Sequence, residues 1–303
     1  MKIRQTARFL PEKIVTNDDF AKTIDTNDQW ILSRTGISQR RFATESNTEM
    51  AVSVGKSLLE KSKISPEDIS CVMVASFTPD NMTPSMACLV QKALGLPTST
   101  MAFDFNAACS GFVYGLWLAQ QMINNNAKGN IMLIGSEKIT SHLDFTDRNT
   151  CILFGDGAAG AILSSGGPDF PFTFGTKGDD QAICCPVGGK ISMAGKEVFV
   201  FAVNAISESL EEILSQTGLS TEDIDHVVCH QANLRIISHV YKKLAIPAEK
   251  FYINLDRYGN TSSASIPIVL DEMAEKNLLN RGDKVLCVGF GAGLTWGATL
   301  VTW

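Results

Sequence analysis

Two segments about 155 positions apart have closely similar patterns, and this repetition constrains the fold more than any other feature of the chain. Residues 65–75 read SPEDISCVMVA and residues 220–230 read STEDIDHVVCH. In each, a serine cap and acidic residues precede a β-branched run typical of a buried strand. Further along, KGNIMLIG (128–135) resembles RGDKVLCVG (281–289), a turn followed by a strand. The sequence therefore predicts two duplicated halves.

The joint between the halves is predicted in SSGGPDFPF, residues 164–172, where glycine and proline interrupt every periodic pattern. We divide the chain into an N-terminal half, residues 1–165, and a C-terminal half, residues 170–303. Helical patterns alternate with short apolar runs in both halves, which predicts two α/β units with mainly buried strands. Since clefts between domains are favoured ligand sites, we expect functional residues from both halves.

Composition and charge argue against several functional classes. The 303 residues are 45% hydrophobic and 19% charged, which is ordinary for a globular protein. A net charge of -6 disfavours a broad nucleic-acid-binding surface. Polar residues and Pro11 interrupt the N-terminal stretch before a signal-like region forms, and no run approaches the roughly 18 apolar residues of a membrane span. We expect a cytoplasmic protein without nucleic acid or membrane partners.

The eight cysteines include no C-x-x-C pair and fall mostly in apolar runs, as reduced core thiols do. Cys109 differs because small residues surround it in FDFNAACSGF, residues 103–112. Residues 101–105 are expected to form a strand and residues 111–123 a helix, so Cys109 falls at the turn between them. The positive end of that helix is expected to lower the pKa of the thiol below its reference of about 8.5. A buried thiol that fits a tight helix–strand contact is the alternative.

Two further polar side chains have settings that suggest partners for a nucleophile. His230 directly follows the apolar run HVVC, at a strand end of the kind that carries catalytic groups in α/β folds. His226 and His239 have no comparable setting and are expected in packing or at the surface. Asn260 lies in a turn before Ser/Thr caps and an expected helix. When the halves are aligned, Asn260 falls within a position or two of Cys109, so both residues would begin helices that face one another.

Six motifs together resemble the β-ketoacyl-acyl carrier protein synthase III family of thiolase-like condensing enzymes. They are FDFNAACSGF (103–112), HQANLR (230–235), YGNTSSAS (258–265), GFGAGLTWGATLV (289–301), DTNDQWILSRTGI (25–37) and DRNTCILFGDGAAGAIL (147–163). The resemblance implies an α/β fold, the duplicated five-layered αβαβα fold of thiolases, and a homodimer. It also implies a catalytic triad of Cys109, His230 and Asn260.

The implied reaction has two stages. A primer acyl group passes from acyl-CoA to Cys109, which divides one difficult condensation into two easier steps. Malonyl-acyl carrier protein then loses carbon dioxide, and the resulting carbanion attacks the acyl group, which initiates fatty acid biosynthesis. His230 and Asn260 would stabilise the enolate oxygen as neutral donors, and the backbone N–H groups of Cys109 and Ala292 would form a second oxyanion site. Coenzyme A thioester is a substrate here, and no tightly bound cofactor or metal is implied.

Other matching positions imply a path for coenzyme A. By resemblance, Trp30 and Arg148 would stack on either side of the adenine, and Arg34 would meet the phosphates. The remaining residues assigned to coenzyme A are Asn233 at the pantetheine and Gly195 and Phe199 along the tunnel. Surface salt bridges or core packing are the alternative roles for these side chains.

A basic stripe is expected to bind the carrier protein. Arg235, His239, Lys242 and Lys243 stand at helical spacing, so one face of the expected helix is positive on a net acidic chain. Acyl carrier proteins are acidic, and complementary charges accelerate encounter. Family members often have another lysine where this chain has Val200, which puts that part of the patch in doubt.

Three other positions depart from the family pattern. A well-studied bacterial type places a phenylalanine of the partner subunit against the acyl pocket, where this chain has Thr83. Primer length and branching are therefore left open. Ser110 and Ala292 replace a common alanine and a frequent glycine, and both are small enough to preserve the mechanism.

Other functions fit parts of the sequence less well. GDGAAG, residues 155–160, satisfies the dinucleotide pattern of an NAD-dependent oxidoreductase, but a strand and breakers follow it instead of the required helix. A metal site is disfavoured because, on a strand, Cys229 would point away from His226 and His230. A related condensing enzyme of polyketide or secondary metabolism, using another acyl-CoA, is the main alternative.

Overall fold

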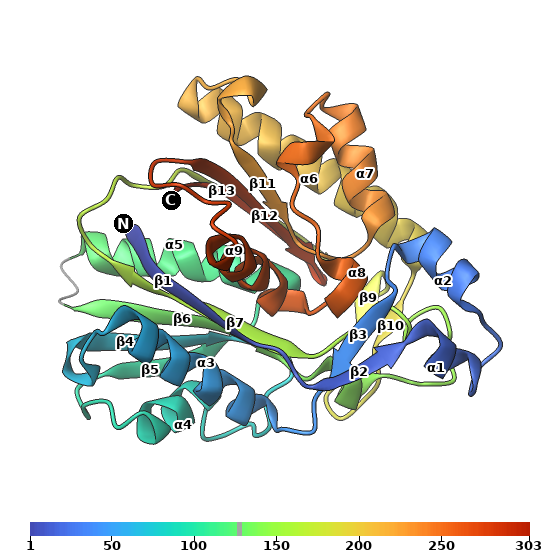
Figure 1. The fold of residues 1–303 in the computed structure, drawn as a ribbon, viewed down its shortest axis with the longest axis horizontal. Helices are drawn as coiled ribbons and strands as arrows, with labels where there is room; N and C mark the ends of the chain where they lie inside the picture. The colour runs from blue at the N-terminus through green and yellow to red at the C-terminus, as the bar shows by residue number, and fades with distance from the viewer. Residues whose placement is uncertain (126–128) are drawn as a thin grey trace.

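The computed structural model describes residues 1–125 and 129–303 and consists of five alternating layers of helices and strands (Figure 1). The outer helices are α3 (Asn47–Ser62) and α4 (Met86–Ala93) on one side, and α6 (Gly195–Thr217) and α7 (Leu234–Lys243) on the other. Two β-sheets lie between them, and α5 (Gly111–Asn124) and α9 (Ser265–Glu275) form the middle layer. Each middle helix packs against strands of both sheets. This is the predicted αβαβα arrangement.

The first sheet has the strand order β1-β7-β6-β4-β5. Its strands are β1 (Lys2–Phe9), β7 (Gly157–Ser164), β6 (Asn130–Glu137), β4 (Ile69–Ala75) and β5 (Met101–Phe105). β7 pairs antiparallel with β1 and β6, whereas β6, β4 and β5 run parallel. The middle strands are almost entirely buried because helices cover both faces, which explains their continuous apolar runs.

The second sheet repeats this order as β8-β13-β12-β11. Its strands are β8 (Phe172–Asp179), β13 (Gly293–Thr302), β12 (Lys284–Gly291) and β11 (His226–Cys229). Beside β11, a parallel bridge between Val227 and Phe251 occupies the position that β5 has in the first sheet. The duplicated architecture predicted from the sequence is confirmed, and the predicted joint falls in the segment between β7 and β8.

The shorter elements gather at one end of the layers (Figure 1). They are β2 (Lys13–Thr16), α1 (Asn17–Ala21), α2 (Asp28–Thr35), β3 (Gln39–Phe42), β9 (Ile183–Cys184), β10 (Ser192–Met193) and α8 (Leu255–Tyr258). β2 pairs with β3, and β9 pairs with β10. Within the described part of the chain, no helix combines the length and apolar content that crossing a bilayer requires.

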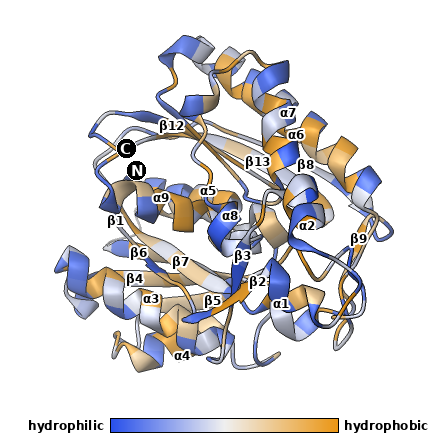
Figure 2. Cartoon of the chain, turned by 45° about the vertical axis from the view of Figure 1, so that its right-hand side comes forward, coloured by the Kyte–Doolittle hydropathy of each residue, from blue (hydrophilic) through white to orange (hydrophobic). Residues whose placement is uncertain are grey.

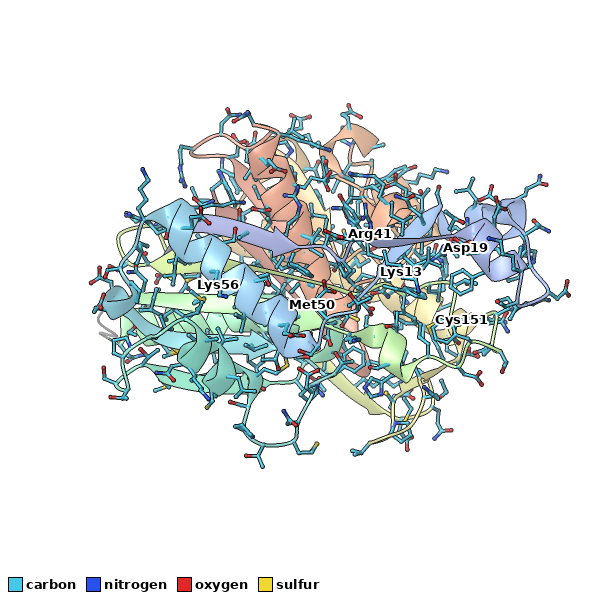
Figure 3. The ribbon with its side chains drawn as sticks, turned by 60° about the horizontal axis from the view of Figure 1, so that its bottom comes forward. Lys13, Asp19, Arg41, Met50, Lys56 and Cys151 are labelled. Atoms are coloured by element: carbon cyan, nitrogen blue, oxygen red, sulfur yellow. The ribbon has the colours of Figure 1, made fainter. Side chains whose placement is uncertain are left out.

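The outer helices bury one face against a sheet, whereas the middle helices are covered by sheets on two sides. Ser46 begins α3 with a capping box, and Met50, Val54 and Leu58 form its buried stripe. Lys56 of the same helix is exposed, and Figure 3 shows Met50 and Lys56 on this helix. The middle helices α5 and α9 are coloured as largely hydrophobic in Figure 2, because sheets cover them on two sides.

Two equivalent glycines allow the halves to meet closely. A Cβ at Gly135 of β6 would lie 2.5 Å from the carbonyl oxygen of Ser263, and one at Gly289 of β12 would lie 2.9 Å from Cα of Ser110. In each sheet, a glycine therefore leaves room for the turn that begins the middle helix of the other half. This reciprocal packing places the two turns beside each other at the seam.

Candidate active site

A cavity of about 1040 Å³ opens at the seam between the halves. Cys109, His230 and Asn260 all line it, together with Ala292, so the structure brings the three predicted side chains to one space. Its volume is in the range of pockets that hold a sizeable small molecule. The N-terminal half contributes the cysteine, and the C-terminal half contributes the other three residues.

Cys109 lies in a 3-10 helix, Ala108–Ser110, that leads directly into α5. The turn is sharp, because Ala108 has a positive φ of 45°. The side-chain Oδ1 of Asn106 accepts a hydrogen bond from the Ala108 N–H at 2.9 Å, which holds that conformation. The predicted strand, turn and helix around the cysteine are confirmed, with β5 before the turn and α5 after it.

Asn260 stands in the equivalent turn of the second half. Ser262 has a φ of 50°, and its N–H donates to Oδ1 of Asn260 at 2.9 Å. Asn260 therefore matches Asn106, three positions before Cys109, and the predicted offset of one or two positions was wrong. The difference has a chemical consequence. Since Oδ1 is engaged with an N–H, the amide group Nδ2 is the part of Asn260 available as a donor to the cavity.

His230 follows β11 and is held on two sides. Its Nδ1 lies 2.7 Å from Oγ of Ser265, the first residue of α9, and Phe290 packs edge-on against its ring. Ser265 Oγ also accepts the Gln231 N–H at 3.4 Å. When the Ser265 hydroxyl donates to Nδ1, the ring proton resides on Nε2. Burial lowers the pKa of His230 to about 3. The imidazole is a neutral donor.

The protonation of Cys109 differs from the prediction. Burial raises the pKa of the thiol to about 12, against a smaller lowering by a hydrogen bond from Ser262. The residue is half-buried because one side faces the cavity, but protein surrounds the sulfur, and a Cβ at Gly291 would lie 3.1 Å from Sγ. Desolvation is the largest cause, so the pKa shift has the opposite direction to the expected fall. Ala292 follows Gly291, which places its backbone beside the thiol.

A carboxylate that the sequence interpretation missed lies behind this turn. Glu137, the last residue of β6, is 0% exposed and accepts hydrogen bonds from Thr78, Ser262 and Ser263. Burial raises the pKa of Glu137 to about 7, against the lowering by these hydrogen bonds. An acidic residue directly after an apolar strand run, IMLIGSE, was the signal that could have identified it.

The residues assigned to coenzyme A line the cavity, except Arg148, which is not part of its wall. The guanidinium groups of Arg34 and Arg148 lie 4.3 and 5.0 Å from the ring centre of Trp30. Arg148 also pairs with Asp25 at 3.2 Å. Arg148 thus rests directly on Trp30, and a base would have to displace it in order to enter between them.

The other assigned positions surround the start of α7. Asn233 caps this helix, accepting from the Arg235 N–H at 2.8 Å, and its Nδ2 donates to the Arg34 carbonyl at 3.1 Å. Gly195 and Phe199 belong to the first turns of α6 and line the cavity wall.

The basic stripe begins at the cavity and continues along α7. The Arg235 guanidinium lies 5.9 Å from the ring centre of Phe199, and both residues line the cavity. Lys242 and Lys243 are exposed in the last turn of the helix. Thr83 is exposed in a separate loop and does not line the cavity of its own chain.

The rival sites do not have the geometry they require. Residues 157–160 of the GDGAAG segment lie in β7, so the segment leads into a strand and not into a phosphate-binding helix. Across residues 1–125 and 129–303, no group of three or more His, Cys, Asp or Glu side chains could hold a metal ion.

Known proteins match this chain in sequence over its full length. The family model described as 3-oxoacyl-[acyl-carrier-protein (ACP)] synthase III matches residues 103–178, and the model of its C-terminal part matches residues 214–303. A beta-ketoacyl-[acyl-carrier-protein] synthase III of Clostridium novyi is 47% identical over 321 residues, covering 100% of this chain and 99% of the relative. The corresponding protein of Clostridium acetobutylicum is 43% identical, with 100% and 98% covered.

Solved structures agree with the sequence relatives. The 3-oxoacyl-[acyl-carrier-protein] synthase III of Aquifex aeolicus superposes with a TM-score of 0.96 at 40% identity, covering 100% of this chain and 99% of that one. A priming β-ketosynthase of the R1128 polyketide pathway superposes with a TM-score of 0.92 at 30% identity, covering 99% and 96%.

Proposed function

This chain belongs to the 3-oxoacyl-[acyl-carrier-protein] synthase III family of condensing acyltransferases, which initiate fatty acid synthesis, and we propose that Cys109, His230 and Asn260 perform its chemistry. The substrates of the proposed reaction are an acyl-CoA primer and malonyl-acyl carrier protein. The products are a β-ketoacyl-carrier protein, coenzyme A and carbon dioxide.

In the first half-reaction the Cys109 sulfur attacks the thioester carbonyl of acyl-CoA. A bond forms between this sulfur and the carbonyl carbon, the bond from that carbon to the coenzyme A sulfur breaks, and the acyl group remains on the enzyme. The oxyanion that develops is stabilised by the backbone N–H groups of Cys109 and Ala292. Loss of one such donor typically costs about 3 kcal/mol of transition-state stabilisation.

In the second half-reaction malonyl-carrier protein occupies the same cavity. Loss of carbon dioxide moves negative charge onto the malonyl thioester oxygen. His230 Nε2–H and Asn260 Nδ2 are two neutral donors that suit this oxygen. Because the pKa of His230 is about 3, its imidazole is uncharged at neutral pH and donates a hydrogen bond without giving up a proton. The enolate carbon then attacks the acyl group and releases the Cys109 sulfur.

The outer residues serve binding in this proposal. Trp30, Arg34 and Arg148 hold the nucleotide end of coenzyme A, and Asn233, Gly195 and Phe199 border its pantetheine arm. The exposed cations of α7, Arg235, Lys242 and Lys243, attract the acidic carrier protein.

We also propose that the chain works as a homodimer in the cytoplasm. β5 is the terminal strand of the first sheet, and its Met101 is 54% exposed. An unpaired edge with an exposed apolar side chain suits pairing with a second copy. Thr83 would then approach the acyl chain of the partner's cavity. Light scattering of the purified protein at micromolar concentration tests the dimer.

The observation that carries the proposal is the convergence of a thiol, a neutral imidazole and a carboxamide on one cavity. Incubation with short-chain acyl-CoA should add one acyl mass to the intact protein, and Cys109→Ala should abolish this addition. Cys88, which is exposed, provides the matched control, because Cys88→Ala should leave the acyl mass unchanged. Labelling that survives Cys109→Ala would reassign the nucleophile.

A further inference from the structure

Glu137 is a buried carboxylate that the proposed mechanism does not use. It is the last residue of β6 and is 0% exposed. Its Oε2 accepts hydrogen bonds from the hydroxyls of Ser76 at 3.2 Å and Thr78 at 2.7 Å, and from the Phe77 N–H at 3.3 Å. This oxygen therefore holds the loop that follows β4 in the first half.

The other carboxylate oxygen contacts the second half. Oε1 accepts from the hydroxyls of Ser262 at 3.1 Å and Ser263 at 2.9 Å, and both serines are buried. These serines follow Asn260 by two and three positions in the same turn. One carboxylate thus links the loop after β4 to the turn that carries a proposed donor to the enolate.

Ser262 connects Glu137 to Asn260. Its hydroxyl donates to Oε1 of Glu137, and its backbone N–H donates to Oδ1 of Asn260 at 2.9 Å. The φ of Ser262 is 50°, in the left-handed region that residues other than glycine rarely adopt. Because this conformation is intrinsically unfavourable, it persists only while surrounding contacts such as these two hydrogen bonds hold the residue.

The carboxamide of Asn260 needs such support. The terminal torsion of an asparagine side chain is soft, so its contacts decide whether Oδ1 or Nδ2 faces the cavity. While Ser262 donates to Oδ1, Nδ2 is the group available to the cavity. A carboxamide turned the other way would present Oδ1, which is an acceptor, to the negative oxygen of an enolate.

The duplicated halves differ at the strand end beside each turn. Gly291 ends β12 as Glu137 ends β6. A Cβ at Gly291 would lie 2.8 Å from Cβ of Cys109, so glycine leaves room there for the nucleophile. Ala108 matches Ser262 in the first turn and has no hydroxyl. The pair of a carboxylate and a hydroxyl that donates to it therefore belongs to the asparagine turn and not to the cysteine turn.

We propose that Glu137 is a positioning residue, which acts through Ser262 to hold the Asn260 carboxamide with Nδ2 toward the cavity during malonyl decarboxylation. The inference rests on the proposed function, in which Asn260 stabilises the enolate. Donors to an oxyanion are effective when they are fixed before the charge develops, and a displacement of about 1 Å can cost about a hundredfold in rate. Since Asn260 acts only in the second half-reaction, Glu137 supports decarboxylation and is not needed for acylation of Cys109.

Single-turnover measurements of the two half-reactions test this role. They are made at about pH 8, where the Glu137 carboxyl is mostly charged because its pKa is about 7. Ser262→Ala removes the hydroxyl that joins Glu137 to the turn, and Glu137→Gln replaces the acceptor itself. Each should slow release of carbon dioxide from malonyl-carrier protein by at least about tenfold and change the rate of Cys109 acylation by less than about twofold.

Ser263→Ala is the matched control. It removes a hydroxyl from the same turn and the same carboxylate oxygen, whereas the bond to Asn260 Oδ1 comes from Ser262. It should slow carbon dioxide release by less than about threefold. A loss as large as that in Ser262→Ala would overturn the proposal, because a general disturbance of the turn would then explain both variants. Acylation that falls as far as decarboxylation in Ser262→Ala would overturn it for the same reason.

The Asn260→Ala variant shows whether the effect of Ser262 passes through Asn260. In this background, Ser262→Ala should change carbon dioxide release by less than about twofold, because the donor that Ser262 positions is already absent. A further loss of about tenfold in the double variant would overturn the proposal.

Crystal structures without substrate test the positioning independently of the proposed function. In Ser262→Ala, the distance from the backbone nitrogen of residue 262 to Asn260 Oδ1 should exceed about 3.6 Å, which is too long for a hydrogen bond. Ser263→Ala should keep this distance near 2.9 Å. An unchanged distance in Ser262→Ala overturns the proposal even if Glu137→Gln does not fold. An unaltered protein that takes up no acyl group would instead contradict the proposed function, so the two failures are distinguishable.

Discussion

The Nδ1 atom of His230 lies 2.7 Å from the hydroxyl oxygen of Ser265, the first residue of the middle helix α9. When the Ser265 hydroxyl donates along this contact, the ring proton resides on Nε2, the nitrogen that the proposal uses as a donor to the enolate. A residue outside the predicted triad is thus hydrogen-bonded to one of its members.

Ser265→Ala should remove this hydrogen bond and leave acylation intact. The imidazole can then adopt either tautomer, and the fraction with Nε2–H falls. We expect malonyl decarboxylation to slow by about tenfold, in line with the loss of a modest hydrogen bond of about 1.4 kcal/mol. Release of carbon dioxide from malonyl-carrier protein and the intact mass of the acyl-enzyme measure the two steps separately. Equal loss of both steps would show that Ser265 is merely structural.

Arg148→Ala should weaken acyl-CoA binding with little change in kcat. Arg148 rests 5.0 Å from the ring centre of Trp30, where the proposal places the adenine. Loss of one stacking guanidinium is expected to raise KM for acyl-CoA about tenfold. Arg4, an exposed arginine of β1, provides the control, since Arg4→Ala should leave KM unchanged. Identical KM values for both variants would remove Arg148 from the binding site.

Charge reversal on α7 should impair the use of carrier protein alone. Arg235, Lys242 and Lys243 are exposed along the helix, and exposed charges act mainly through encounter with an oppositely charged partner. Replacing Lys242 and Lys243 with Glu should raise KM for malonyl-carrier protein at low salt, and added salt should narrow the difference in KM from the unaltered protein. KM for acyl-CoA serves as the internal control. An unchanged KM for the carrier protein would make this stripe an ordinary solvated face.

Glu272 predicts how stability depends on pH. It is almost fully buried, and its hydrogen bonds to Lys276, Arg257 and Asn254 overcome desolvation and lower the pKa of its carboxyl to about 2. Because its pKa is lower in the folded state than in the unfolded state, the charged carboxylate stabilises the fold above about pH 4.5, and this contribution is lost as pH falls toward 2. Glu272→Gln should lower the free energy of unfolding at pH 7 by about 3 kcal/mol.

Urea denaturation at several pH values measures this difference. The gap between Glu272→Gln and the unaltered protein should narrow as pH falls from about 4.5 toward 2. Glu275→Gln is the control, because Glu275 is largely exposed and should change stability by less than about 1 kcal/mol. A constant gap at all pH values would mean that Glu272 contributes through packing and not through charge.

Local pattern was sufficient to predict the elements around Cys109. Small residues between an apolar strand and an amphipathic run predicted the turn between β5 and α5, and both elements occur as expected. The two repeated segments similarly predicted β4 and β11 at matching places in two sheets. These elements depend on residues that are close in sequence, so the periodicity of apolar residues is sufficient to predict them.

The chemistry of the site depends on contacts between distant residues, which periodicity does not contain. Ser262 lies 125 positions from Glu137, and only the packing of one half against the other joins them. The same packing buries the sulfur of Cys109, so the pKa of this thiol moves opposite to the direction expected from its helix terminus. The offset between Asn260 and Cys109 became clear only from the matching turns at Ala108 and Ser262.

A single-turnover assay of the two half-reactions tests the central claim most directly. His230→Ala and Asn260→Ala are each mixed first with acyl-CoA and then with malonyl-carrier protein, and the acyl-enzyme mass and released carbon dioxide are quantified. Cys109 should be acylated fully in both variants, while carbon dioxide release should fall by at least about a hundredfold. Acylation that fails as severely as decarboxylation would contradict a thiol that accepts the acyl chain while the other two side chains stabilise the enolate.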